Sequence, residues 1–364
     1  MDDAAANFDF GLGWLEADGP DADIVLSTRV RLARNLQGHP YVGSASDGQR
    51  EVICRTVARA FENTSMRRRA VLLRMTEMSE RARKVLFERR LISREIAGLR
   101  TGPDGGVAVA IAGDGPVSVL INEEDHLRLQ GLVGGLRVAD AWSMVDRLDE
   151  ELGRGLHFAY HHEFGYLTCC PTNVGTGLRA SALLHLPGLV LTKEIAKALQ
   201  GISEVGLTFR GLHGEGSEVV GNFFQISNQT TLGQSEEDLV EHLTRIVTTV
   251  LEKERRARQV LLRDAGPVTE DKVWRAYGLL RYARALEYEE LMNLLSGVRL
   301  GVSLQLLPSP SVYSLNRIMI LSQAAHLEEA AGRTLTAPER RAHRAEYVRR
   351  VLAAGNPPTS GPGG

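Results

Sequence analysis

The spacing of apolar residues changes once along this chain, near Pro267. Before it, helical stretches are interrupted by runs typical of strands, namely "GVAVAIAG", "VSVLINEED", "FGYLTCC", "EVGLTFRGL" and "VVGNFFQISN". After it, "TEDKVWRAYGLLRYARAL", "EYEELMNLLSG" and "APERRAHRAEYVRRVL" all have helical spacing, and no convincing strand remains. The sequence therefore predicts an α/β (α+β) domain with a largely antiparallel sheet up to about residue 262, followed by a small helical domain.

Two helices can be placed from local signals. The longest is expected to begin at Ser235, whose hydroxyl forms a capping box with Asp238, and to continue beyond Glu254. Another is expected between Asp47 and Ser65. Its predicted buried stripe consists of Val52, Cys54, Val57, Ala60 and Phe61.

Composition excludes several classes of protein. The net charge of −2 gives no reason to expect nucleic-acid binding or attraction to an acidic membrane surface. No apolar run approaches the length of a membrane span, and the acidic "MDDAAANFDF" start differs from a signal peptide. The three cysteines lack the spacing of a disulfide framework or a metal site. We expect a protein of the reducing cytoplasm.

The segment "VLSTRVRLARNL", residues 25–36, places Arg29, Arg31 and Arg34 in an otherwise apolar run that reads as a strand. Because side chains alternate along a strand, Arg29 and Arg31 should point to the same side. Two cations so close together repel each other unless an anion lies between them. Taken alone, the segment is either a solvated strand face or an anion site.

Three further segments combine charged residues with small ones. "NEEDH", residues 122–126, is either an acidic turn or a base or cation clamp, because adjacent carboxylates can hold a guanidinium or raise each other's pKa. "CCPTNVGTGLRAS", residues 169–181, is either a turn with a buried cysteine or a thiolate beside backbone amides and Arg179 that bind phosphate. "FRGLHGEGSE", residues 209–218, is either a plain surface loop or a mobile lid.

The order "STRVRLAR", "NEEDHLR", "CPTNVGTGLRAS" and "RGLHGE" resembles the signature segments of the phosphagen (ATP:guanido) kinases. The similarity is greatest to bacterial protein-arginine kinases of the McsB type, through "DIVLSTRVRLARNL", "GEGSE", "ISNQTTLG" and the helical extension. It implies transfer of the ATP γ-phosphate to arginine side chains of proteins, marking them for degradation in a bacterial stress response. The implied parts are an N-terminal segment (1–23), a phosphagen-kinase-like catalytic domain (24–255), a helical domain (265–353) and a disordered tail (354–364).

The resemblance assigns the nucleotide site. Guanidiniums are suited to phosphate oxygens because each offers a rigid fork of donors. Magnesium is expected to be held through ATP, with Glu123 ordering its water, because no direct metal-ligand spacing is present. The implied ATP-binding residues are Ser27, Thr28, Arg29, Val30, Arg31, Arg90, Arg128, Arg179, Ala180, Ser181, Ala182, Leu183, Arg210, Gly211, Leu212, His213, Gly214 and Glu215.

The acceptor guanidinium is protonated at neutral pH, so a base must take its proton as it attacks. By resemblance, Glu124 is that base, Asp125 supports it, and Glu215 grips the guanidinium from the glycine-rich loop. Cys170 is expected to lie against the guanidinium as a thiolate that orients it, without a covalent intermediate.

The helical extension carries a partial match to a phosphoarginine-binding, allosteric motif. Arg340, Arg344 and Ala345 match it, whereas Arg341 stands where the family has aspartate. Arg90 likewise stands where the family tends to have a histidine near the nucleotide.

Two alternatives remain open at this point. One is a phosphagen kinase for free arginine or another small guanidino compound, which the short segment before Ile24 and the helical extension disfavour. The other is a phosphoarginine-binding adaptor with weak kinase activity. The partners that the resemblance implies are protein substrates with exposed arginines, a zinc-binding activator (McsA type), an AAA+ unfoldase–protease (ClpC/ClpP type), a heat-shock repressor (CtsR type) and a second copy of the chain.

Overall fold

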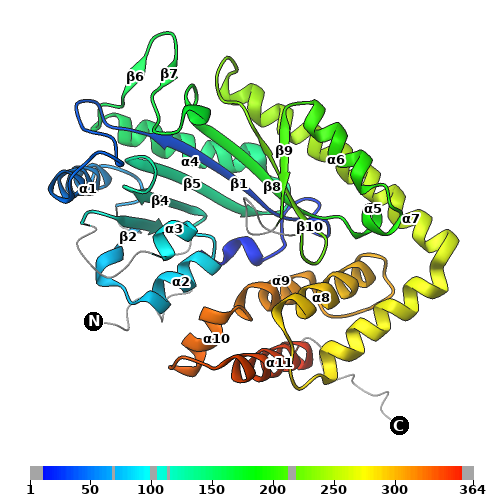
Figure 1. The fold of residues 1–364 in the computed structure, drawn as a ribbon. Coiled ribbons are helices and arrows are strands. Elements are labelled where there is room, and N and C mark those ends of the chain that lie inside the picture. The colour runs from blue at the N-terminus through cyan, green and yellow to red at the C-terminus, as the bar shows by residue number, and fades with distance from the viewer. Residues whose placement is uncertain (1–10, 68–69, 99–104, 113–114, 212–218, 355–364) are drawn as a thin grey trace.

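One antiparallel sheet organises the first part of the chain, and a helical domain follows it (Figure 1). The computed structural model describes residues 11–67, 70–98, 105–112, 115–211 and 219–354. Within them, eight strands pair antiparallel in the order β2-β3-β4-β5-β1-β8-β10-β9. The predicted fold class is confirmed.

The strands are short except for β1 at the centre. Their bounds are β1 Val25–Arg34, β2 Ala70–Arg74, β3 Ala108–Ala112, β4 Val117–Ile121, β5 Leu127–Gly134, β8 Leu178–His185, β9 Leu207–Arg210 and β10 Phe223–Asn228, with a separate hairpin of β6 Tyr160–His161 and β7 Gly165–Tyr166.

Helices flank the sheet and make up the C-terminal domain. Their bounds are α1 Asp47–Phe61, α2 Glu80–Glu88, α3 Arg94–Ala97, α4 Val138–Gly153, α5 Pro187–Leu191, α6 Ile195–Glu204, α7 Glu236–Tyr282, α8 Tyr288–Ser303, α9 Val312–Leu321, α10 Ala324–Ala331 and α11 Ala337–Ala354, and the 3-10 turns are η1 Gly13–Leu15, η2 Met75–Glu77 and η3 Pro171–Asn173. Among the described residues, no helix is both long and apolar enough to cross a membrane.

The two faces of the sheet have different coverings. Helices α4 and α7 pack on one face, where Val30 and Leu32 of β1 enter the largest apolar core. On the other face, α2 and α3 pack over the β3–β4 end, while the helical domain packs against Leu26, Leu183 and the η1 turn. Between these two coverings the second face of β1, β5 and β8 remains accessible.

Helix α7 joins the two domains. It begins with the predicted Ser235–Asp238 capping box and runs for 47 residues. Ala265 has non-helical dihedral angles (φ −142°), two residues before Pro267. A proline inside a helix lacks the donor N–H and crowds the carbonyl four residues earlier, which explains the kink. The change in apolar spacing near Pro267 thus falls inside a bent helix.

Three details of the predicted elements are wrong. Val52 is 43% exposed, and Ile53 takes its place in the buried stripe of α1. Of "FGYLTCC" only Gly165–Tyr166 forms a strand, because the two cysteines belong to the turn that enters η3. Strands β2, β5 and β8 were not predicted, since charged residues and glycines interrupt the apolar pattern of β5 and β8.

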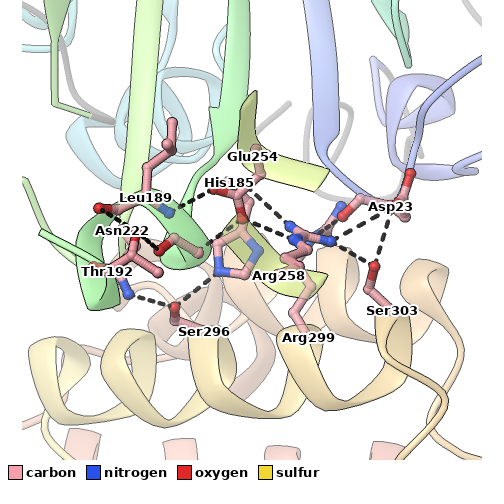
Figure 2. A network of polar contacts seen from close by, with 11 residues as sticks. Asp23, His185, Leu189, Thr192, Asn222, Glu254, Arg258, Ser296, Arg299 and Ser303 are labelled. Carbon is pink, nitrogen blue, oxygen red and sulfur yellow. Dashed lines mark hydrogen bonds and ion pairs between the residues drawn. The ribbon is translucent and has the colours of Figure 1, made fainter. Parts of the chain in front are cut away.

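A buried polar network ties the helical domain to the sheet (Figure 2). Glu254 of α7 accepts hydrogen bonds from the backbone N–H groups of Gly188 and Leu189, both at 2.9 Å, and from Arg258 Nε at 2.7 Å. Arg258 also donates to the carbonyl of His185 at 3.2 Å, and His185 Nε2 lies 2.8 Å from the hydroxyl of Ser296 in α8. The two domains therefore share buried charges as well as apolar contacts.

Candidate active site

A cleft of about 760 Å³ lies on the accessible face of the sheet. Arg29, Arg31 and Ala33 line it from β1, because alternate residues of a strand share a face. The helices on the far side of the cleft contribute residues from α2, α3 and the α9–α10 turn. Among the residues that the sequence predicts for the site, the cleft is lined by Arg29, Arg31, Arg90, Glu123, Glu124, Arg128, Cys170, Arg179 and Arg210.

Five of the guanidiniums that line the cleft come from strands or strand ends. Arg29 and Arg31 lie on β1, Arg128 on β5, Arg179 on β8 and Arg210 at the end of β9. Arg31 and Arg179 are direct cross-strand partners. The pairing of β5, β1, β8, β10 and β9 thus places Arg128, Arg179 and Arg210 on the same cleft as Arg29 and Arg31.

The arginines make the site strongly electropositive. Burial and the neighbouring guanidiniums lower the pKa of Arg31 to about 9 and hold that of Arg29 well below its usual range. The Nε atoms of both side chains are buried and have no hydrogen-bond partner among the described residues. Buried donors of this kind fit a ligand with several anionic oxygens, such as a polyphosphate.

Two carboxylates border the arginine cluster. Glu123 Oε2 lies 2.5 Å from Arg128 Nη1, and Glu124 Oε2 lies 2.5 Å from Arg128 Nη2. Partial burial is the largest cause that raises the pKa of Glu124, and the charges of Asp125 and Glu123 add to it against the opposing effect of Arg128. A carboxylate with a raised pKa is a better proton acceptor than one with an ordinary pKa.

Asp125 has a different position from its neighbours. It is fully buried and accepts hydrogen bonds from Asn35 Nδ2 and from the backbone N–H of Cys169, both at 2.7 Å. Its contacts therefore fix the 122–126 turn against the cysteine segment. Any effect of Asp125 on Glu124 passes through the shape of this turn and through its charge.

The two cysteines are not equivalent. Cys170 lines the cleft, with its Sγ atom 3.0 Å from the hydroxyl of Thr172. Burial, reinforced by Asp125, raises the pKa of Cys169 to about 12, so this thiol stays protonated. Only Cys170 is placed to contact a molecule in the cleft.

The other end of the cleft surrounds Arg90. Its guanidinium donates to Gln225 Oε1 at 3.0 Å and to the hydroxyl of Ser27 at 3.4 Å, and it lies 5.9 Å from the ring centre of Trp14. Burial lowers the pKa of Arg90 to about 10. Trp14 and Gln225 were not predicted, because nothing in their own segments marks them.

Some of the residues predicted to bind ATP have side chains that point away from the cleft. Thr28 donates its hydroxyl hydrogen to the carbonyl of Gly135, and Val30, Ala180 and Ala182 lie in the core beneath the sheet. Strand alternation gives the reason, since these positions are out of phase with Arg29 and Arg179. These side chains do not reach the cleft, and nucleotide binding at these positions stays a prediction.

The remaining residues predicted to bind ATP are either buried in the sheet or lie at or beyond the edge of the described segment. Ser181 is buried on the strand face shared with Arg179, and Leu183 packs into the core with the helical domain. Gly211 is the last described residue before the 212–218 gap. Leu212, His213, Gly214 and Glu215 lie outside the described residues.

The predicted phosphoarginine residues lie at the start of α11. Arg340 contacts Glu328 Oε1 at 3.1 Å, and Arg341 pairs with Glu287. Arg344 is buried and donates to the carbonyls of Ser322 and Leu286 at 3.0 and 2.8 Å. Ala345 is fully buried in the domain core.

Comparison with known proteins finds two matching family models. The model for the ATP:guanido phosphotransferase C-terminal catalytic domain matches residues 52–257, and that for the protein-arginine kinase McsB C-terminal domain matches residues 267–361. The protein-arginine kinases of Brevibacillus brevis and Moorella thermoacetica are each 43% identical to the chain; both alignments cover 93% of it, and 94% and 97% of those proteins.

Solved structures have the same fold. Lombricine kinase matches with a TM-score of 0.58 at 24% identity, over 69% of this chain and 70% of that chain. The duplicated taurocyamine kinase from Schistosoma mansoni, with bound transition state analog components, matches with a TM-score of 0.59 at 26% identity, over 74% of this chain and 38% of that chain.

Proposed function

The chain belongs to the protein-arginine kinases of the ATP:guanido phosphotransferase family, and we propose that it phosphorylates arginine side chains in the cleft described above. One observation carries the assignment of the site. The five guanidiniums carried by the sheet strands line the same cleft as Glu123 and Glu124, and Arg128 contacts both of these carboxylates. Phosphate donor and guanidinium acceptor thus each meet groups of opposite charge.

ATP is the phosphoryl donor in this proposal. Its phosphate oxygens would take hydrogen bonds from Arg29, Arg31, Arg128, Arg179 and Arg210, including the buried Nε donors. Magnesium, when bound with ATP, would neutralise charge on the phosphates. The ion would be held through ATP, and Glu123, which lines the cleft beside Arg128, would order its water.

The acceptor must be an arginine whose guanidinium reaches Glu124. A guanidinium nitrogen forms a bond to the γ-phosphorus, while the bond from that phosphorus to the bridging oxygen of ADP breaks. The proton leaving the nitrogen passes to Glu124, whose raised pKa suits it to accept. Cys170 would lie against the guanidinium and orient it, and Glu215 would hold it from the other side.

The wider cellular role is also proposed. The match to the McsB C-terminal domain model and the similarity to protein-arginine kinases support a role in stress response and protein quality control. Phosphoarginine would bind and regulate the chain at Arg340, Arg341 and Arg344, and the implied activator, unfoldase–protease, repressor and second copy would be its partners in the cytoplasm.

The testing experiment compares wild type with Glu124→Gln. Both are given ATP, magnesium and an unfolded arginine-rich protein, with free arginine in a parallel reaction, and products are identified by mass spectrometry under conditions that preserve the P–N bond. We expect phosphoarginine on the protein, reduced about 10²- to 10⁴-fold by the substitution, because a general base contributes about that much.

Each other outcome has a definite meaning. Product on free arginine alone would make the chain a small-molecule kinase. If Glu124→Gln phosphorylated the protein as fast as wild type, the assigned base would be wrong. Glu252→Gln, on an exposed turn of α7, is the matched control and should leave the rate unchanged.

A further inference from the structure

One wall of the cleft comes from the helical domain. Ile320, in the last turn of α9, and Gln323, the residue that precedes α10, both line the cleft that contains the five guanidiniums. The match to the ATP:guanido phosphotransferase model ends at residue 257. This wall therefore lies outside the segment that carries the phosphotransferase signature, and the predicted nucleotide residues do not include it.

The register of β1 gives the cleft a direction. Ala33 is paired with Arg128, which binds both acceptor-side carboxylates. Arg31 and Arg29 follow along the same face, and Ser27 comes last, in contact with Arg90. If the acceptor lies at the Ala33 end and the phosphates lie along the arginines, the end near Ser27 is left for the ribose and base. This step rests on the proposed function.

The helical domain contacts that same end through α2. Glu88 accepts hydrogen bonds from the backbone N–H groups of Ala325 and His326 at 2.8 and 3.0 Å. Its Oε2 atom also lies 2.7 Å from His326 Nδ1. Glu88 therefore closes the first turn of α10 from outside the helix, where backbone donors have no partner within the helix.

Arg89 determines which ring nitrogen of His326 donates to Glu88. Its Nε donates to His326 Nε2 at 3.2 Å, so that nitrogen accepts and Nδ1 carries the proton given to Glu88. Both ring nitrogens are thus engaged by consecutive residues of the catalytic domain. Arg90, the next residue, has a left-handed backbone (φ +66°) that turns its side chain toward Ser27 and Gln225.

We propose that the α9–α10 turn forms the wall of the ribose-and-base end of the ATP site, through Ile320 and Gln323. In this arrangement, Glu88 and His326 are positioning residues, because they hold the turn against the segment that presents Arg90. The helical domain is then part of the nucleotide site itself. Its ligand is the nucleoside part of ATP or ADP, and the phosphates remain with the arginine cluster.

The experiment compares two probes that differ only in the nucleoside. Binding of magnesium–ADP and of magnesium–pyrophosphate to the full chain is measured by calorimetry, without an acceptor. We expect Gln323→Ala to weaken ADP binding about 3- to 10-fold, the effect of one lost contact, and to leave pyrophosphate binding unchanged. Gln259→Ala, on the exposed face of α7, is the matched control and should change neither.

A second variant tests the positioning role. His326→Ala should raise KM for ATP by a similar factor while kcat at saturating ATP and KM for the protein substrate stay at wild-type values. A purely structural role would lower kcat together with the melting temperature. That result would overturn the positioning role.

The outcomes separate this inference from the proposed function. If wild type binds ADP and Gln323→Ala binds it equally well, the inference is wrong and the kinase assignment stands. If Gln323→Ala weakens both probes equally, the turn acts at the phosphates and the inference is again wrong. If wild type binds neither probe, the nucleotide site and this inference fail together.

Discussion

Arg128 links the two halves of the site because both carboxylates contact its guanidinium at 2.5 Å. It belongs to the cationic cluster by position and to the carboxylate pair by contact. An acceptor arginine that approaches Glu124 therefore competes with Arg128 for the same carboxylate. Since two adjacent acids serve one cation, Glu123 remains to pair with Arg128 when Glu124 contacts the acceptor.

The raised pKa of Glu124 predicts that kcat/KM for phosphorylation falls at acidic pH. Only the ionised carboxylate accepts a proton, and a raised pKa keeps it protonated up to a higher pH than the ordinary value of 4.5. As the pH falls, kcat/KM should therefore decline through an apparent pKa above 4.5. The check is a kcat/KM profile from about pH 8 to about pH 4.

Circular dichroism at each pH is the control for that profile, because loss of fold at acid pH also lowers the rate. A limb at or below 4.5, with the fold intact, would contradict the structural environment described for Glu124. The residual activity of Glu124→Gln should lack this limb.

Strand alternation made part of the site predictable and hid another part. It correctly predicts that Arg29 and Arg31 share a face, and their strand partners bring Arg179 and Arg128 beside them. It does not predict that Trp14 lies near the cleft, because the pattern of residues within one segment does not show which other segments it will contact. Gln225 and the α9–α10 turn are hidden for the same reason.

At the scale of elements, the turn between η3 and β8 supports both sides of β1. Gly177 has φ +66°, and a Cβ atom there would lie 2.6 Å from the carbonyl oxygen of Ala33. On the opposite face of the sheet, Arg34 donates to the carbonyl of Thr176 at 2.8 Å and pairs with Asp149 at 2.7 Å. The turn that joins η3 to β8, just after Cys170, is thus anchored to β1 by close contacts that the "GTG" sequence permits.

Gly177→Ala should lower both stability and activity. A left-handed alanine costs about 1 kcal/mol, and the clash with the Ala33 carbonyl adds to this by displacing the turn from β1. Gly206→Ala is the matched control, because Gly206 has φ +76° with nothing within 4 Å of the added Cβ.

Urea denaturation and kcat measured on both glycine variants separate the two contributions. We expect both to lose about 1 kcal/mol of unfolding free energy. Only Gly177→Ala should lose more than that and also lose kcat. Equal effects of the two substitutions would mean that the approach of Gly177 to β1 is unimportant.

The start of a long helix is easier to predict from the sequence than how far the helix continues. The capping box at Ser235 identifies the start of α7 because the signal is local. That the same helix continues through Pro267, bent at Ala265, depends on packing against α8 and α11. Tertiary contacts here outweigh the local preference of proline to end a helix.

At the scale of the whole molecule, two domains share one charged interior. Glu254 is fully buried, and Arg258 is its cationic partner at 2.7 Å. Arg258 reaches the hydroxyl of Ser303 in the helical domain at 2.5 Å and, at 3.5 Å, Asp23 in the segment before β1 (Figure 2). Separating the domains would expose or orphan these groups, so the catalytic cleft and its helical wall are expected to unfold as one unit.

Arg258→Met tests whether the two domains unfold together and whether the buried ion pair stabilises their junction. Removing one partner of a buried ion pair leaves an uncompensated charge, which costs about 3–5 kcal/mol of unfolding free energy. The double variant Glu254→Gln/Arg258→Met removes that charge and should recover part of the loss, although the single amide oxygen can accept from only one of the two backbone N–H groups, of Gly188 and Leu189, that donate to separate carboxylate oxygens of Glu254. Calorimetry of the wild type, the single variant and the double variant measures both effects, with one transition expected for each. Equal losses in the two variants would place the energy of this junction in its apolar packing rather than in the ion pair.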